Sequence, residues 1–136
     1  MYPEPLVKPM KEELVQAGFE ECLTPDSVEK AVSQKGTVLM VVNSVCGCAA
    51  GAARPGVKAS LENAKKPAKL TTVFAGFDVD AVSRARKHFA PDPPSSPAIA
   101  LFKDGQLVHF VERHSIEGHS AKVISEHLKA VYDEFC

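Results

Sequence analysis

Two cysteines separated by one residue are the side chains of this chain best suited to chemistry. Cys46-Gly47-Cys48 follows an apolar run, residues 38–42, and precedes the small residues 49–53. The run predicts a buried strand and the small residues permit a helix, so Cys46 is expected at or near a helix N-terminus. There, free backbone N–H groups and the helix dipole favour a thiolate, the form of cysteine that attacks disulfides and binds metals.

The one-residue spacing of the two thiols limits the disulfide that they can form. Disulfides prefer Cα atoms about 5.5 Å apart and a dihedral angle of about 90°. Residues two positions apart reach this geometry only in a constrained backbone, which Gly47 helps to adopt. A disulfide here is expected to be strained and easily reduced, as catalytic disulfides are. The predicted chemistry is thiol–disulfide exchange, in which Cys46 attacks and forms a mixed disulfide and Cys48 resolves it.

Three other interpretations of the thiol pair stay open. Both cysteines can be small buried fillers, since free cysteine is commonly buried, although cytoplasmic dithiols beside such units are more often redox or metal sites. They can instead be two soft ligands of a metal site that His109, His114 or His119 completes, but no second closely spaced ligand pair follows them. The third interpretation is a scaffold domain that binds a partner and carries vestigial thiols.

A second candidate site lies at the end of a proline-rich loop, residues 90–97. The loop ends in Ser96-Pro97 and leads into a predicted strand, where a proline can leave backbone groups free for a partner. Only about one X–Pro bond in twenty is cis in folded proteins, so a trans bond is the default. A cis bond would let the backbone of Ser96 pair with a docked, extended substrate segment. Ser96 and Pro97 are therefore candidate substrate-binding residues.

Two further cysteines lie outside the pair. Cys22 is expected to pack at a strand end. Cys136, the final residue, is interpreted either as an exposed thiol without a role or as an auxiliary thiol that forms a mixed disulfide with a small thiol or another chain.

Length and charge limit the class of protein. A chain of 136 residues is about one domain and can bury one good core, so residues 1–136 are expected to form a single domain. Its 16 basic and 17 acidic side chains give a net charge of -1, which predicts no nucleic-acid or membrane-surface partner. No apolar segment reaches spanning length, and the N-terminus lacks the pattern of a secretory signal. The expected location is cytoplasmic, where thiols stay reduced.

Hydrophobic periodicity and turn residues predict an alternation of helices and strands. Strands alternating with helices indicate parallel pairing and right-handed crossovers, while the last two strands form a hairpin. The predicted fold class is α/β: a thioredoxin-like three-layer sandwich with a central mixed β-sheet and helices on both faces. The expected helices are 9–17, 25–36, a kinked one from the cysteines to about 64, 78–89 and 119–135, and the expected strands are 19–23, 37–42, 70–75, 98–102 and 106–112.

The residues around the cysteines carry a resemblance that extends over nearly the whole chain. Residues 43–51, Asn-Ser-Val-Cys-Gly-Cys-Ala-Ala-Gly, resemble the signature of the bacilliredoxin family. The similarity continues through residues 53–55, 73–76, 94–97, 109–110, 113–114 and 116–119 to Cys136. Members of that family are thioredoxin-like cytoplasmic thiol oxidoreductases of bacteria. They are implicated in removing bacillithiol from client proteins and have been described as disulfide isomerases.

The resemblance implies a role for each matching residue. Cys46 would be the attacking thiolate that accepts the small thiol, and Cys48 would be its partner. Ser96-Pro97 would be the cis-proline site, and we assign Asn43 to substrate binding with it. The implied partners are client proteins with mixed disulfides and a low-molecular-weight thiol such as bacillithiol, with no resident cofactor. A single residue between the cysteines departs from thioredoxin, so a strong general reductant is not expected.

Overall fold

A five-stranded mixed sheet forms the centre of the computed structural model, which describes residues 1–136. The strand order is β1-β3-β2-β4-β5. β2 runs parallel to β3, β3 runs parallel to β1, and β4 is antiparallel to both β2 and β5. The bounds are β1 Glu20–Glu21, β2 Thr37–Asn43, β3 Lys69–Phe74, β4 Ala98–Lys103 and β5 Gln106–Val111.

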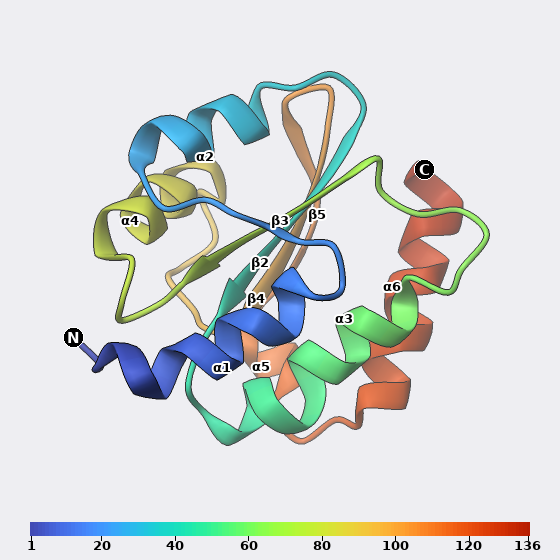
Figure 1. The fold of residues 1–136 in the computed structure, drawn as a ribbon. Coiled ribbons are helices and arrows are strands. Elements are labelled where there is room, and N and C mark those ends of the chain that lie inside the picture. Colours follow the sequence, from blue (N-terminus) through green and yellow to red (C-terminus); the bar gives the residue numbers. More distant parts are fainter.

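The central strand β2 is buried along its whole length, as its unbroken apolar run predicts. Its side chains alternate between two cores. Met40 and Val42 enter the core beneath α2 (Pro25–Val32) and α4 (Val79–His88), whereas Leu39 and Val41 enter the opposite core. That second core is covered by α1 (Glu4–Val15), α3 (Arg54–Ser60) and α6 (Ala121–Phe135) (Figure 1). The predicted three-layer arrangement is confirmed.

The first helix begins earlier than the sequence predicted. α1 starts at Glu4 rather than at Pro9, and Pro9 lies inside it. Pro5 occupies the first turn, where a missing N–H costs no helical hydrogen bond. Val7 and Leu14, seven residues apart on one face, are both fully buried, so the longer helix gains apolar burial that the shorter one would lack.

The segment after the cysteines is not one kinked α-helix. A π-helical turn, η1 (Ala49–Ala53), is followed by α3, which ends at Ser60 rather than near residue 64. Proline lacks an N–H and its ring clashes with the carbonyl four residues earlier. The wider π turn accommodates that clash, and Pro55 then lies in the first turn of α3, where proline is tolerated.

The C-terminal part adds one element that the sequence did not predict. A single helical turn, α5 (Arg113–Ile116), lies between β5 and α6. Four residues show no periodicity, which is why pattern analysis overlooks such a turn. α6 begins at Ala121 rather than at His119, because Ser120 is its N-cap and accepts a hydrogen bond from the Val123 N–H.

The predicted apolar stripe of α6 is buried through Ile124, Leu128 and Val131, while Phe135 is only half-buried. None of the helices in this structure combines the length and apolarity needed to cross a bilayer.

Candidate functional site

The two cysteines lie where β2 gives way to the helical segment. The strand ends at Asn43, and the Cys46 carbonyl accepts hydrogen bonds from the backbone N–H groups of Ala49 (3.1 Å) and Ala50 (3.2 Å). Cys46 therefore stands at the start of the first helical turn, as predicted. Both cysteines are free thiols and half-buried, which is the partial exposure that a reacting thiol needs.

Hydrogen bonds gather around the Cys46 sulfur. Its Sγ lies 2.6 Å from the Cys48 Sγ, and the Ser44 hydroxyl donates to it over 3.2 Å. Burial by itself raises the pKa of the Cys46 thiol, but these two side chains and the backbone N–H groups of Ala49 and Cys48 outweigh burial. The net pKa of Cys46 lies below its ordinary value. Cys46 is thus the thiol of the pair that ionises first.

Cys48 is shifted in the opposite direction. Burial raises the pKa of its thiol, and the neighbouring Cys46 raises it further, because a second negative charge beside a thiolate is unfavourable. Arg113 of α5 acts against this shift as a nearby positive charge. In the singly ionised pair, Cys48 keeps its proton and donates it in a hydrogen bond to the Cys46 thiolate. The arrangement separates a thiol that ionises more readily from a partner that stays protonated.

This asymmetry predicts the order in which the cysteines react with iodoacetamide. The alkylation rate of Cys46 is expected to reach half its maximum at a lower pH than that of Cys136, whose pKa burial raises. Cys22 is buried, with a pKa raised to about 11, and should react last. Peptide mapping by mass spectrometry after timed alkylation at several pH values measures this order. A Cys136 midpoint below that of Cys46 would contradict it.

A buried arginine supports the turn that carries Cys46. Arg54 at the start of α3 donates to the Asn43 side-chain oxygen (2.9 Å) and to the Ser44 carbonyl (2.8 Å), and it pairs with Glu13 of α1. Asn43 in turn donates to the Met10 carbonyl over 3.1 Å. These bonds connect the end of β2, α1 and α3, and so fix the backbone just before the thiol.

The burial of Asn43 corrects its assigned role. Its side chain is 1% exposed, and its oxygen accepts bonds from Arg54 and from the Ser44 N–H. Because the side chain is buried, a substrate cannot reach it. Asn43 is a positioning residue for the Cys46 turn, not a substrate contact.

Replacing Arg54 with methionine is expected to destabilise the protein. Arg54→Met leaves the Asn43 oxygen and the Ser44 carbonyl without their buried donor, at a cost of about 2–3 kcal/mol. Glu13 is partly exposed and regains water, which limits the loss. Urea unfolding measures the change. Arg84→Met, which removes an exposed ion pair with Glu29, is the matched control and should cost much less. Equal losses in the two variants would contradict the buried role.

The Ser96-Pro97 bond is cis, and so is Ala90-Pro91 in the same loop. Ser96 lines a pocket of about 260 Å³ together with Ser44, Val45 and Cys46. The Ser96 N–H donates to no other group of the chain, while its carbonyl accepts a 3.4 Å bond from Arg113. The fold therefore brings residues 46 and 96, fifty positions apart, to one pocket.

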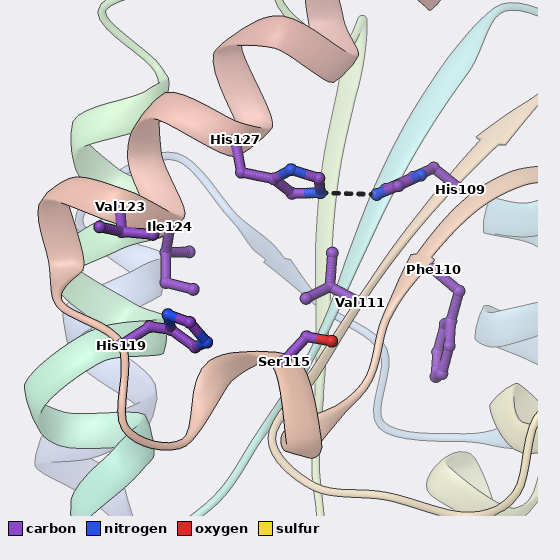
Figure 2. Close-up of a pocket in the computed structure, with 8 residues that line it drawn as sticks. All are labelled: His109, Phe110, Val111, Ser115, His119, Val123, Ile124 and His127. Carbon is purple, nitrogen blue, oxygen red and sulfur yellow. Dashed lines mark hydrogen bonds between the residues drawn. The ribbon is translucent and has the colours of Figure 1, made fainter.

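The histidines of the metal interpretation lie elsewhere. His109 and His119 line a different pocket of about 330 Å³ between β5 and α6, which contains neither cysteine. Figure 2 shows His109 facing His127, and their Nε2 atoms are 2.9 Å apart. His114 is exposed on α5. Because the chain contains no cluster of three or more metal-ligating side chains, the cysteine–histidine site lacks its further ligands.

The two remaining cysteines ionise less readily than Cys46, because burial raises the pKa of both thiols. Cys22 is buried beside β1, as expected, with its pKa raised to about 11. Cys136 is exposed at the end of the chain. Burial of its sulfur raises the thiol pKa, against a hydrogen bond from Thr37 and the positive charge of Lys103.

Several residues around the thiols were not among the predicted site residues. Ser44, Arg54, Arg86 and Arg113 either bond to the Cys46 turn or line its pocket. A signal existed for Arg54, since a single charged residue within a run of alanines and glycines is unusual. Arg86 lies forty residues from the thiols on an amphipathic helix, where nothing in the sequence distinguishes it from its basic neighbours.

Comparison with known protein families gives a match over nearly the whole chain. Residues 2–136 match the family model described as disulphide isomerase. A bacilliredoxin of Cytophaga hutchinsonii is 65% identical over 134 residues, which cover 98% of this chain and 99% of that protein. A bacilliredoxin of Koribacter versatilis is 49% identical, covering 100% of this chain and 94% of that protein.

Solved structures resemble the fold at low sequence identity. A mutant thioredoxin of Halobacterium salinarum aligns with a TM-score of 0.59 and 17% identity, over 88% of this chain and 91% of that one. The oxidised thioredoxin of Plasmodium falciparum aligns with a TM-score of 0.58 and 18% identity, over 87% and 98%. The fold is thioredoxin-like.

Proposed function

The chain belongs to the bacilliredoxin family, which carries out thiol–disulfide redox chemistry, and on that premise we propose that Cys46 removes small thiols from mixed disulfides on client proteins. The observation that supports this most directly is the Cys46 sulfur itself, half-buried, with a lowered pKa and hydrogen bonds from Cys48 and Ser44. A thiolate at neutral pH is the reactant that exchange requires.

The first step is a thiol–disulfide exchange without net oxidation. The Cys46 thiolate attacks the small-thiol sulfur of a client mixed disulfide. The client S–S bond breaks, the client cysteine leaves as a thiolate, and a new disulfide joins Cys46 to the small thiol. Because Cys48 is protonated in the resting pair, it does not compete for the substrate.

The second step removes the small thiol from Cys46. Cys48 loses its proton to solvent and attacks the Cys46 sulfur, the small thiol leaves as a thiolate, and a Cys46–Cys48 disulfide forms. Arg113, whose positive charge lowers the pKa of Cys48, favours that deprotonation. A dithiol or small-thiol reductant then supplies two electrons and returns both cysteines to the reduced form. Attack by a second small thiol on the Cys46 mixed disulfide is the alternative exit.

The cis-proline loop is the proposed docking element for the client. The Ser96 N–H is free of partners within the chain and lies at the pocket that contains Cys46. An extended client segment can accept this hydrogen bond through a backbone carbonyl while its disulfide approaches the thiol. Ser96 and Pro97 thus keep their proposed substrate-binding role, in which the Ser96 backbone provides the contact.

The proposal extends to location and type of substrate. A free dithiol is maintained in a reducing compartment, which is why we place the reaction in the cytoplasm. The same attack on a wrongly paired disulfide within a client would be isomerase chemistry. Bacillithiol is the small thiol that the family name suggests. Cys136 is a second exposed thiol that can accept it after Cys46.

A direct transfer experiment tests the proposal. The reduced protein is mixed with a client peptide bearing glutathione or bacillithiol in a mixed disulfide, and intact-mass spectrometry follows both partners. The expected result is loss of the small thiol from the peptide, with a transient equal gain on the protein that maps to Cys46. A peptide with an internal disulfide and no small thiol measures isomerisation separately. A small thiol that stays on the peptide would overturn the proposal.

A further inference from the structure

The pocket beside Cys46 carries two positive side chains and no carboxylate. Arg86 reaches it from α4 and Arg113 from α5, and no aspartate or glutamate is among its lining residues. The pocket of about 260 Å³ is just below the usual size of a small-molecule site. It fits the polar arm of a small thiol or one side chain of a client.

Arg86 has hydrogen-bonding capacity that the protein does not use. Its Nε is buried and has no hydrogen-bond partner, and no carboxylate pairs with its guanidinium. Buried donors are nearly always satisfied, so an unsatisfied one at a pocket indicates a partner that binds there. The planar guanidinium fits a carboxylate through two parallel hydrogen bonds.

Arg113 of α5 lines the same pocket. Its Nε pairs with Glu117 and its Nη1 contacts the Ser96 carbonyl, while its Nη2 makes no hydrogen bond within the chain. Because Glu117 already pairs with Arg113, the guanidinium without a carboxylate partner is that of Arg86, and one incoming carboxylate can pair with it. A phosphate dianion would leave excess negative charge beside the thiolate, so a carboxylate is the better complement.

We propose that Arg86 and Arg113 form a carboxylate-binding subsite that holds the group attached to the sulfur under attack by Cys46. This inference rests on the proposed function and specifies its substrate: a mixed disulfide with a carboxylate close to the disulfide. The carboxylate has two possible sources, the small thiol or an acidic client residue beside the modified cysteine. Arg86 is a binding residue in this scheme and takes no part in bond breaking.

Matched probes separate the two sources. One pair joins a neutral client peptide to 3-mercaptopropionate or to its amide. The other pair joins 2-mercaptoethanol to a peptide with aspartate or asparagine beside the cysteine. The second-order rate constant of thiol transfer to Cys46 is measured by quenching the reaction with acid at timed intervals and analysing the products by mass spectrometry. The carboxylate member of at least one pair is expected to react about 10-fold faster, a difference typical of a charge-assisted hydrogen bond.

Arginine variants test the assignment. Arg86→Gln is expected to lower the ratio of the carboxylate-probe rate to the amide-probe rate to about 1, while Arg86→Lys keeps part of the preference through its charge. Lys87→Gln, an exposed neighbour on α4, is the matched control and should keep the full preference. Thermal unfolding of each variant confirms folding, and the Arg86→Lys result stands if Arg86→Gln does not fold.

The outcomes distinguish the subsite from the function on which it rests. Equal rates for both members of each pair in the wild-type protein, or an undiminished preference in Arg86→Gln, would overturn the subsite while transfer to Cys46 persists. Failure of the wild-type protein to accept a thiol from any of the four probes would overturn the proposed function, and the subsite with it.

Discussion

A Cys46→Ser variant is expected to lose at least about 1,000-fold of the rate at which the small thiol leaves the client, since removal of a catalytic nucleophile costs far more than loss of a binding contact. The serine hydroxyl stays protonated at neutral pH and forms no disulfide. Serine fits the half-buried position and can still accept the hydrogen bond that Ser44 donates to the Cys46 sulfur. The loss therefore reports on chemistry and not on folding.

Cys136→Ser provides the matched control for that experiment. It removes an exposed thiol at the C-terminus, so the rate of transfer from client to protein should be unchanged. Release of small thiol from the client is followed by mass spectrometry at equal protein concentration, with thermal unfolding of both variants alongside. Cys46→Ser activity within a few-fold of wild type would contradict the role of Cys46 as nucleophile.

The Cys48→Ser variant is expected to keep the first step and to stop at the second. A serine hydroxyl can replace the Cys48 thiol as donor to the Cys46 thiolate, so the Cys46 pKa stays low and the attack on the client proceeds. Without a resolving thiol, the protein accumulates with the small thiol bound at Cys46. In a single turnover with no free thiol supplied, release of the small thiol from Cys46 should be at least about 100-fold slower than in the wild-type protein.

A second substitution at the same position separates the two roles of Cys48. Cys48→Ala removes both the resolving thiol and the hydrogen-bond donor, so the pKa of Cys46 should rise and the first step at neutral pH should slow relative to Cys48→Ser. The pH dependence of the single-turnover rate measures this difference. Release of the small thiol from Cys46 at the wild-type rate in Cys48→Ser, without added thiol, would show that Cys48 does not resolve the intermediate.

Local features of the sequence predicted the elements that carry the site. The unbroken apolar run before the cysteines predicted a strand buried on both faces, and β2 is fully buried. The helix expected from residue 25 begins there as α2, and the Thr24 side chain caps it by accepting a hydrogen bond from the Ser27 N–H. The turn at residues 103–105 predicted the hairpin, and Asp104 and Gly105 both have positive φ. Short-range turn and cap chemistry is encoded in adjacent residues, which explains these successes.

Errors arose where neighbours in space decided the structure. The start of α1 depends on the burial of Val7, which no local pattern reveals. The π turn accommodates the Pro55 ring, which would clash with the carbonyl four residues earlier in a regular α-helix. Asn43 was assigned to substrate binding together with Ser96-Pro97, but Arg54, eleven residues away, donates a hydrogen bond to its side-chain oxygen. Sequence distance did not indicate that Arg54 and Asn43 would meet.

The sequence by itself located the candidate reactive atoms: two thiols one residue apart, after a buried strand and before a helical turn, with Cys46 at the helix start. Only the tertiary structure decided their surroundings. It placed residue 96 and the two arginines at the Cys46 pocket, moved the histidines to another pocket, and buried Asn43 beneath the turn. The spacing of residues along the chain defines the Cys-Gly-Cys motif. Its electrostatic and hydrogen-bonding partners come from distant segments, which helix packing on both faces of the sheet brings together.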